Sequence, residues 1–218
     1  ALPIFHTRYE VSNNAGQDIC DIVNNEGFDF LLVGSGISMS DSPDDIAATR
    51  YRTSFYNRYF KRFKAPESWF YPGALLKDKT KMFIARSNCD VGVFINRNFV
   101  KATNTLVVIS SEEDLFLLDY TRTLLKATHG SVGIVAKMST TTPGHDQILK
   151  ELWDFVSSIP QTQLLPDKDL TPGLFNSYNF MLIGYNTWND VSEHRKEALQ
   201  KMPSTLILNK NRRSSSDN

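Results

Sequence analysis

Three short segments carry residues suited to holding a phosphate or another anion. Gly34-Ser35-Gly36, Ser110 and Gly184 each follow or end an apolar run of the kind that forms a buried strand. In an open α/β sheet, ligands bind beyond the carboxyl ends of parallel strands, where glycines let the backbone approach a phosphate. The candidate ligand pocket therefore comprises Gly34, Ser35, Gly36, Ser110 and Gly184. The alternative is that Gly34 and Gly36 only turn the chain.

The sequence offers no set of residues for catalysis or for a metal. It has no Gly-x-Ser-x-Gly segment and no phosphate-binding P-loop, and the histidines lack the spacing of metal ligands. His145-Asp146 is better read as the cap of a helix. Cys20 and Cys89 are expected to be buried free thiols in a reducing compartment. We therefore expect a protein that is not an enzyme, with no catalytic residue and no metal site.

Two charged segments could contact partners. Residues 46–64 interleave aromatic side chains with bases and contain no acid. Either this segment lies on an anionic membrane surface or a partner, or its aromatic stripe packs on the sheet while the bases stay in water. In the tail, Ser215 follows two arginines and is a candidate for phosphorylation. The bases of the candidate membrane or partner contact are Arg50, Arg52, Arg58, Lys61 and Arg62.

The composition is that of an ordinary globular protein. The chain has 218 residues, with 24 basic and 24 acidic side chains and a formal net charge of zero. A balanced chain has no overall attraction to nucleic acid, so we expect no nucleic-acid partner. No apolar stretch approaches the roughly 20 residues that a membrane span requires, and no signal peptide is recognisable. We therefore expect this segment to lie in water, even if the full polypeptide spans a membrane.

Helical and strand patterns alternate along the chain. Such alternation predicts an α/β fold with parallel strands joined by right-handed crossovers. The first strand, over 28–33, reads as covered on both faces because it is almost entirely apolar. Residues 160–172 read as a loop. The expected strands are 4–11 (weak), 28–33, 91–95, 105–109, 132–136, 178–183 and 205–208, and the expected helices are 15–25, 46–64, 75–87, 112–128, 146–158 and 189–201.

The chain shows an internal correspondence. A strand ending in glycine, an insertion, a helix and a short strand occur at 28–95 and again at 178–208. Only the second occurrence has an opening strand-helix-strand, at 105–136. We therefore expect two related halves, which pack through their last strands, near 91–95 and 205–208. The expected division is 1–103 for a first half incomplete at its N-terminus, 104–209 for the second half and 210–218 for a disordered tail.

Several segments resemble the cytosolic C-terminal region of monovalent cation/proton antiporters. Gln17-Asp18-Ile19-Cys20 is similar to the Glu-Asp-Ile-Cys segment of plant cation/proton exchangers, and residues 87–97 are similar to their Ala-Pro-Cys-Ser-Val-Gly-Ile-Leu-Val-Asp-Arg stretch. Residues 105–122 and 180–184 resemble later strands of the same region. The long aromatic insertion at 46–72 points to the fungal potassium/proton antiporter branch.

This resemblance implies two universal-stress-protein-like (adenine-nucleotide alpha-hydrolase-like) halves attached to a transmembrane exchanger. It also implies a cytosolic regulatory domain on an intracellular membrane such as the Golgi or endosome, and a homodimer. Universal stress proteins that bind ATP carry Gly-x-x-Gly, whereas here Gly34 and Gly36 are separated by one residue. Ser110 stands near the position of their ribose-binding Asp. The cofactor therefore stays unknown, with a nucleotide as one alternative.

Three functions remain open from the sequence. The leading hypothesis is a non-catalytic module that modulates transport or assembly of a potassium or other monovalent cation/proton antiporter. The rivals are a stand-alone nucleotide-binding universal stress protein and a structural dimerisation module.

Overall fold

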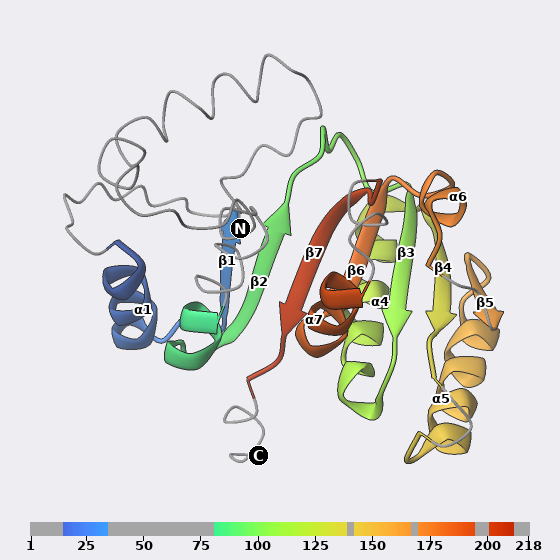
Figure 1. Cartoon of the computed structure of the whole chain (residues 1–218), viewed down its shortest axis with the longest axis horizontal. Helices are drawn as coiled ribbons and strands as arrows, with labels where there is room; N and C mark the ends of the chain where they lie inside the picture. The colour runs from blue at the N-terminus through green and yellow to red at the C-terminus, as the bar shows by residue number, and fades with distance from the viewer. Residues whose placement is uncertain (1–14, 35–80, 139–141, 167–169, 195–200, 212–218) are drawn as a thin grey trace, which may run out of the picture.

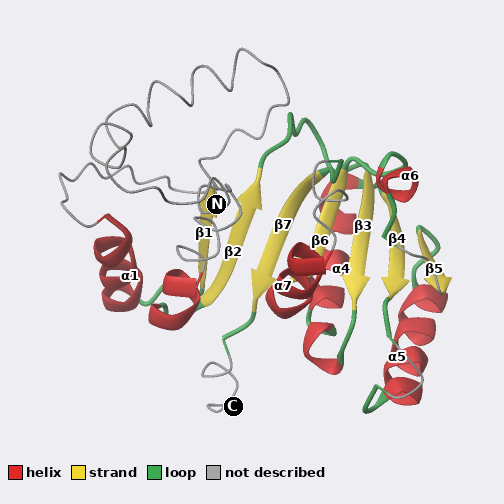
Figure 2. Cartoon of the chain, in the orientation of Figure 1, coloured by secondary structure: helices red, strands yellow, loops and turns green. Residues whose placement is uncertain are grey.

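The computed structural model describes residues 15–34, 81–138, 142–166, 170–194 and 201–211. Within these residues, seven strands form one sheet in the order β1-β2-β7-β6-β3-β4-β5, with helices on both faces (Figures 1 and 2). All neighbouring strands are parallel except β2 and β7. The strands are β1 (Phe30–Gly34), β2 (Asp90–Ile95), β3 (Asn104–Ile109), β4 (Ser131–Ala136), β5 (Thr162–Pro166), β6 (Phe180–Gly184) and β7 (Ser204–Asn209).

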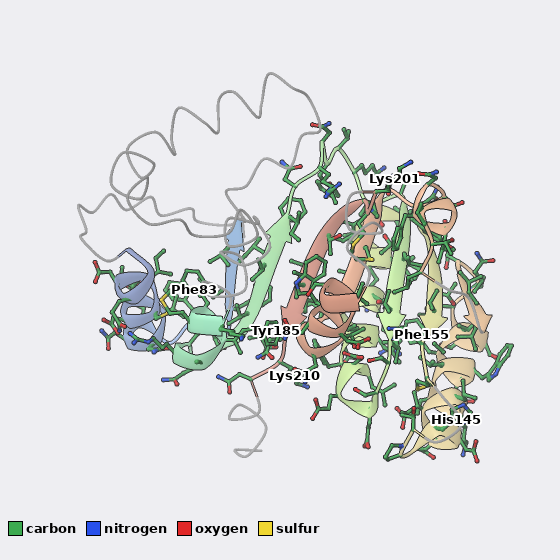
Figure 3. The ribbon with its side chains drawn as sticks, in the orientation of Figure 1. Phe83, His145, Phe155, Tyr185, Lys201 and Lys210 are labelled. Atoms are coloured by element: carbon green, nitrogen blue, oxygen red, sulfur yellow. The ribbon has the colours of Figure 1, made fainter. Side chains whose placement is uncertain are left out.

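The helices divide between the two faces of the sheet. One face is covered by α4 and α5, whose apolar side chains pack on β3, β4 and β6. The other face is covered by α1, the helical residues 81–86, α6 and α7. On that face Phe83 lies between α1 and β1 (Figure 3). The helices are α1 (Ala15–Glu26), α4 (Leu117–Thr128), α5 (His145–Ser158), α6 (Pro172–Phe175) and α7 (Tyr185–His194), with a 3-10 turn, η2 (Glu112–Asp114).

The predicted mixed α/β fold with mostly parallel strands is confirmed. The buried thiols are confirmed too, since Cys20 and Cys89 are both free and buried in one core. His129 ends α4 as predicted, in a left-handed conformation with φ 52° and its N–H donating to the Leu125 carbonyl. The predicted elements over 4–11 and 46–64 lie outside the described residues.

The prediction of a first strand covered on both faces is wrong. Among the described strands β1 is at the edge of the sheet, and Phe30 and Leu32 on one of its faces are 36% and 58% exposed. An apolar run predicts burial only if a neighbouring element covers each face, and the run cannot show whether that element exists.

Four further predictions are corrected. The helix predicted over 112–128 is interrupted, because η2 precedes α4. The loop predicted over 160–172 holds β5 and the start of α6. The last long helix begins at Tyr185, directly after β6, rather than at Asn189. His145 is not a cap, because Gly144 holds that position in a left-handed conformation and makes no side-chain capping bond.

The predicted pairing of residues 91–95 with 205–208 is confirmed. β2 and β7 pair antiparallel, with Val93 opposite Ile207 at the middle of the ladder. This single antiparallel junction joins the strands on its two sides into one continuous sheet (Figure 1). Strands on opposite sides of the junction therefore end at opposite edges of the sheet.

Candidate functional site at the carboxyl ends of β3 and β6

The strand order reverses between β3 and β6. From β3 the chain passes through β4 to β5 on one side, with α4 and α5 on one face. It then returns to β6 and β7 on the other side of β3, with α6 and α7 on the opposite face. In open α/β sheets, this reversal leaves a crevice beyond the carboxyl ends of the two strands, where ligands bind. The candidate site therefore lies beyond Ile109 and Gly184.

A buried carboxyl group fills this place. Asp114 of η2 is only 2% exposed. Its Oδ2 accepts three hydrogen bonds, from the Ser110 N–H at 2.8 Å, the Ser110 hydroxyl at 3.1 Å and the Thr187 hydroxyl at 2.7 Å. The two hydroxyls also contact each other. One carboxyl group thus joins the end of β3 to the first turn of α7.

Gly184 makes room for this carboxyl group. A Cβ atom at position 184 would lie 1.9 Å from Asp114 Oδ1, which no real contact allows. The absence of a side chain at the end of β6 therefore lets Asp114 lie against the backbone where β6 passes directly into α7. A negative group is favoured there, because the amino-terminal end of a helix carries partial positive charge.

Two more polar contacts fix α7 over the same edge. Asn186 donates to Glu113 at 2.7 Å, next to the Asp114 cluster. Lys137, just after β4, forms an ion pair with Asp190 of α7 at 2.7 Å. These partners are partly or fully exposed, so each contact contributes little stability in water. Together with Asp114, they connect α7 to the segments that follow β3 and β4.

This arrangement favours holding an anion, and the chain supplies that anion itself. Backbone and hydroxyl donors at a strand end beside a helix terminus are what a phosphate or carboxylate of a ligand would use. Here all three donors already serve Asp114. A ligand could use the same donors only after Asp114 had moved away.

The structure brings together part of the predicted pocket. Ser110 and Gly184 lie on opposite sides of Asp114. Gly34 does not join them, because β1 runs opposite to β3 and β6 and ends at the other edge of the sheet. Ser35, Gly36, Ser215 and the arginines and lysine at 50–62 lie outside the described residues.

Sequence reasoning missed Asp114 and Thr187. In the single helix predicted over 112–128, Asp114 is one of three acids in the first turn, where the helix dipole alone accounts for them. Asp114 instead ends a separate 3-10 turn, and there it is buried. Its place directly after a buried strand was the available signal. The sequence did not show which of the three consecutive acids would turn in.

A second polar junction lies at the start of β2. Asp90 accepts hydrogen bonds from the Tyr120 hydroxyl at 2.9 Å and from the Asn211 N–H at 2.7 Å. Burial and the hydrogen bond to Asp90 raise the pKa of Tyr120. Burial, with the neighbouring Asp90, also raises the pKa of Cys89, which disfavours a reactive thiolate. This junction connects α4 and the residue after Lys210 to β2.

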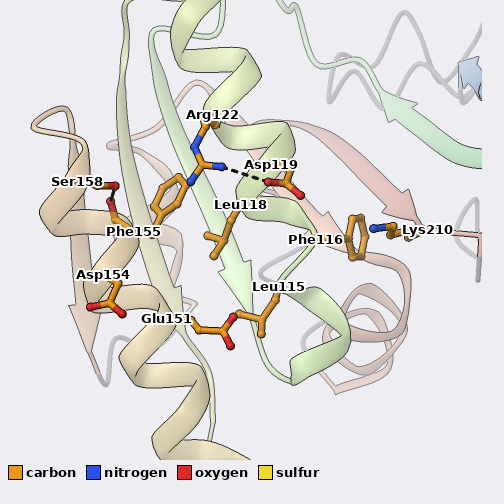
Figure 4. Close-up of a pocket in the computed structure, with 10 residues that line it drawn as sticks. All are labelled: Leu115, Phe116, Leu118, Asp119, Arg122, Glu151, Asp154, Phe155, Ser158 and Lys210. Atoms are coloured by element: carbon orange, nitrogen blue, oxygen red, sulfur yellow. Dashed lines mark hydrogen bonds and ion pairs between the residues drawn. The ribbon is translucent and has the colours of Figure 1, made fainter. Parts of the chain in front are cut away.

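An open groove of about 540 Å³ separates α4 from α5 (Figure 4). Its main polar feature is Arg122, which pairs with Asp119 at 3.3 Å and lies 5.3 Å from the centre of the Phe155 ring. The groove contains none of the predicted site residues. Because Arg122 and Asp119 are 49% and 76% exposed, this is a solvated surface feature, and the carboxyl end of β3 and β6 remains the better candidate site.

No protein-family model matches this sequence, and no match is found among curated proteins. Among solved structures, the chain is similar to a universal stress protein from Archaeoglobus fulgidus DSM 4304, with a TM-score of 0.51 and 11% sequence identity. The similarity covers 90% of this chain and 66% of that protein. At this identity the likeness shows the fold alone. The chain therefore has a universal-stress-protein-like fold, as predicted.

Among the described residues, no helix combines the length and the apolar character that a membrane span requires.

Proposed function

We propose that this chain is a non-catalytic regulatory module in which the ligand crevice of a universal-stress-protein-like fold is closed by the chain's own carboxyl group. The module acts within the cytosolic region of a potassium or other monovalent cation/proton antiporter. It modulates transport or assembly by way of its contacts with the attached transmembrane domain, not by turning over a substrate.

The observation that carries this proposal is the buried Asp114. Its Oδ2 takes the Ser110 and Thr187 donors, and its Oδ1 lies where any side chain at Gly184 would clash. A nucleotide phosphate would compete with a group that is covalently attached and already in place. Such an intramolecular group has an effective concentration that a dissolved ligand does not reach.

The antiporter context is supported by the resemblance of two segments and by where they lie. Residues 17–20 fall in α1, and residues 87–97 contain β2. Cys20 and Cys89 from these two segments lie in the same core, and the Ser87 hydroxyl donates to the Cys20 sulfur at 3.7 Å. The resembling segments therefore form one packed unit, as parts of a shared domain would.

Titration of the purified chain with ATP and AMP, together with light scattering, tests the proposal. We expect no saturable change in melting temperature with either nucleotide at millimolar concentration, because the crevice is filled. Gly34→Ala is the matched control variant, since it changes a strand-end glycine far from Asp114.

The two rival functions predict different results, one in the nucleotide titration and one after deletion of residues 1–218. A nucleotide-binding universal stress protein would show saturable stabilisation that Gly184→Ala weakens and Gly34→Ala does not. A structural dimerisation module would show a stable dimer and, after removal of residues 1–218 from the parent polypeptide, lost assembly with unchanged transport per assembled molecule. Saturable nucleotide binding would overturn the closed crevice.

A further inference from the structure

The free edge of β1 and one of its faces are open together. β1 pairs with β2 on one side, and no strand among the described residues pairs with its other side. On the face that α4 and α5 cover elsewhere, Phe30 is 36% exposed and Leu32 is 58% exposed. Phe28, just before the strand, is 49% exposed. A row of unpaired backbone groups beside exposed apolar side chains is a site for adding a strand.

This open face continues a core that already exists. The Phe30 ring lies 6.0 Å from the Tyr120 ring of α4. Phe30 and Leu32 both lie over Gly92, beside Leu206. Leu206 and Tyr120 in turn pack against the core beneath α4 and α5. The apolar layer under α4 therefore extends across β7 and β2 to β1, where the described helices no longer cover it.

The strand pairing relates β1 and β2 to β6 and β7 by a local twofold axis. Phe30–Gly34 pairs in parallel with residues 90–94, just as Phe180–Gly184 pairs with residues 204–208. The antiparallel pairs of β2 and β7 are symmetric about Val93 and Ile207. The sequences of β1 and β6, Phe-Leu-Leu-Val-Gly and Phe-Met-Leu-Ile-Gly, agree at the ends and in the middle.

Under this axis, the free edge of β1 corresponds to the edge of β6 that is occupied by β3. The open face of β1 corresponds to the face of β6 that is covered by α4. Beside β6, one strand-helix segment thus occupies the strand edge and covers the face. This segment is residues 104–128, which is 25 residues long. That segment precedes β6 in the chain.

We propose that the free edge and open face of β1 hold a strand-helix segment built like residues 104–128. Because residues 104–128 precede β6, the corresponding segment precedes β1 in the same polypeptide. Its strand pairs in parallel with β1, and its helix covers Phe30 and Leu32. A second copy of this chain could pair with the edge, but its own β3 is already paired on both sides.

Thiol labelling of a cysteine at position 32 tests this proposal. Leu32→Cys is compared in residues 1–218 and in a version extended by about 60 natural residues, enough for two strand-helix units. The control is Trp153→Cys on α5, because Trp153 is 54% exposed and lies far from β1. The native thiols give little background, since Cys20 and Cys89 are buried.

We expect the Leu32→Cys thiol to react at least tenfold more slowly in the extended protein, and the Trp153→Cys thiol to react equally in both. Equal labelling of position 32 in both proteins would overturn the proposal. Slow labelling of position 32 already in residues 1–218 would also overturn it. If that slow labelling depends on protein concentration, a second copy covers the face; if it does not, residues 1–218 cover the face themselves.

Hydrogen exchange of the β1 amides in the unsubstituted proteins gives the same comparison if the cysteine variant does not fold. None of these readouts depends on transport or on nucleotide binding, so this inference and the proposed function can fail separately.

Discussion

Asp114 is the residue on which the account of the site depends. A carboxyl group that is 2% exposed is costly to bury unless donors surround it, and here Ser110 and Thr187 supply them. The fold places a local anion where an open α/β sheet usually accepts an external one. Gly184 leaves the space that Asp114 occupies, since a Cβ atom there would lie 1.9 Å from its Oδ1.

Replacing Asp114 should therefore leave several buried donors without an acceptor. We expect Asp114→Ala to lower the free energy of unfolding by about 2–3 kcal/mol, because unsatisfied buried groups cost about 1–3 kcal/mol each and part of that cost is relieved by water. Urea denaturation measures the change. Formate should restore part of the stability of Asp114→Ala by occupying the same position, and chloride at equal ionic strength should not. An Asp114→Ala protein within 0.5 kcal/mol of the unsubstituted chain would contradict the assignment.

The Tyr120–Asp90 hydrogen bond should be visible in the dependence of stability on pH. The folded pKa of Tyr120 is raised above its ordinary value of 10.0. The contribution is therefore fully present below pH 10, and it declines as the pH rises above 10 because the unfolded tyrosine then ionises first. We expect Tyr120→Phe to cost about 1 kcal/mol at pH 8, and the difference from the unsubstituted chain to shrink between pH 10 and 11. Urea denaturation at each pH provides the measurement, and a constant difference would exclude the contribution.

At the scale of elements, β1 and β6 are near-copies in different surroundings. Both end in glycine, yet a Cβ at Gly184 would meet Asp114 Oδ1 at 1.9 Å, whereas one at Gly34 would meet no described atom within 4 Å. Among the described residues, Gly34 is therefore a strand end without neighbours, and Gly184 lines a filled crevice. The difference comes from the elements beside them and not from the strands.

The two glycines should respond differently to the same substitution. We expect Gly184→Ala to destabilise the fold by about 2 kcal/mol or more, since overpacking a filled site typically costs 1–3 kcal/mol. Gly34→Ala should stay within about 0.5 kcal/mol, as exposed substitutions do. Thermal unfolding of both variants gives the comparison. Equal losses would mean that the glycines act through backbone conformation, and that Asp114 does not fill the crevice as described.

The sequence predicted most elements, because periodicity and turn residues are local. The strands at 91–95, 105–109 and 132–136 and the end of α4 at His129 all follow from such local patterns. The exposure of β1 depends on a neighbour that its own apolar run cannot reveal. Asp114 and Thr187 are 73 residues apart, so their contact is set by the return of the chain from β5 to β6. Neither strand pattern nor helix pattern encodes that return.

At the scale of the molecule, the sheet combines a nearly complete doubly wound unit with a shorter one. β3 to β7 carry helices on both faces, whereas the described part of the β1–β2 side carries them on one. The antiparallel junction of β2 and β7 makes the two sides one continuous sheet. Paired strands thus connect β1 to the crevice beyond β3 and β6, and the proposed regulatory role requires a physical connection of this kind.

The proposed regulatory role is tested most directly by ion transport of the parent polypeptide with and without residues 1–218. Transport is measured as cation-dependent proton flux in membrane vesicles that contain equal amounts of protein. The account predicts an altered rate or altered pH dependence without these residues, while the parent polypeptide with Gly34→Ala keeps its normal flux. Unchanged flux, membrane targeting and abundance after the deletion would contradict it.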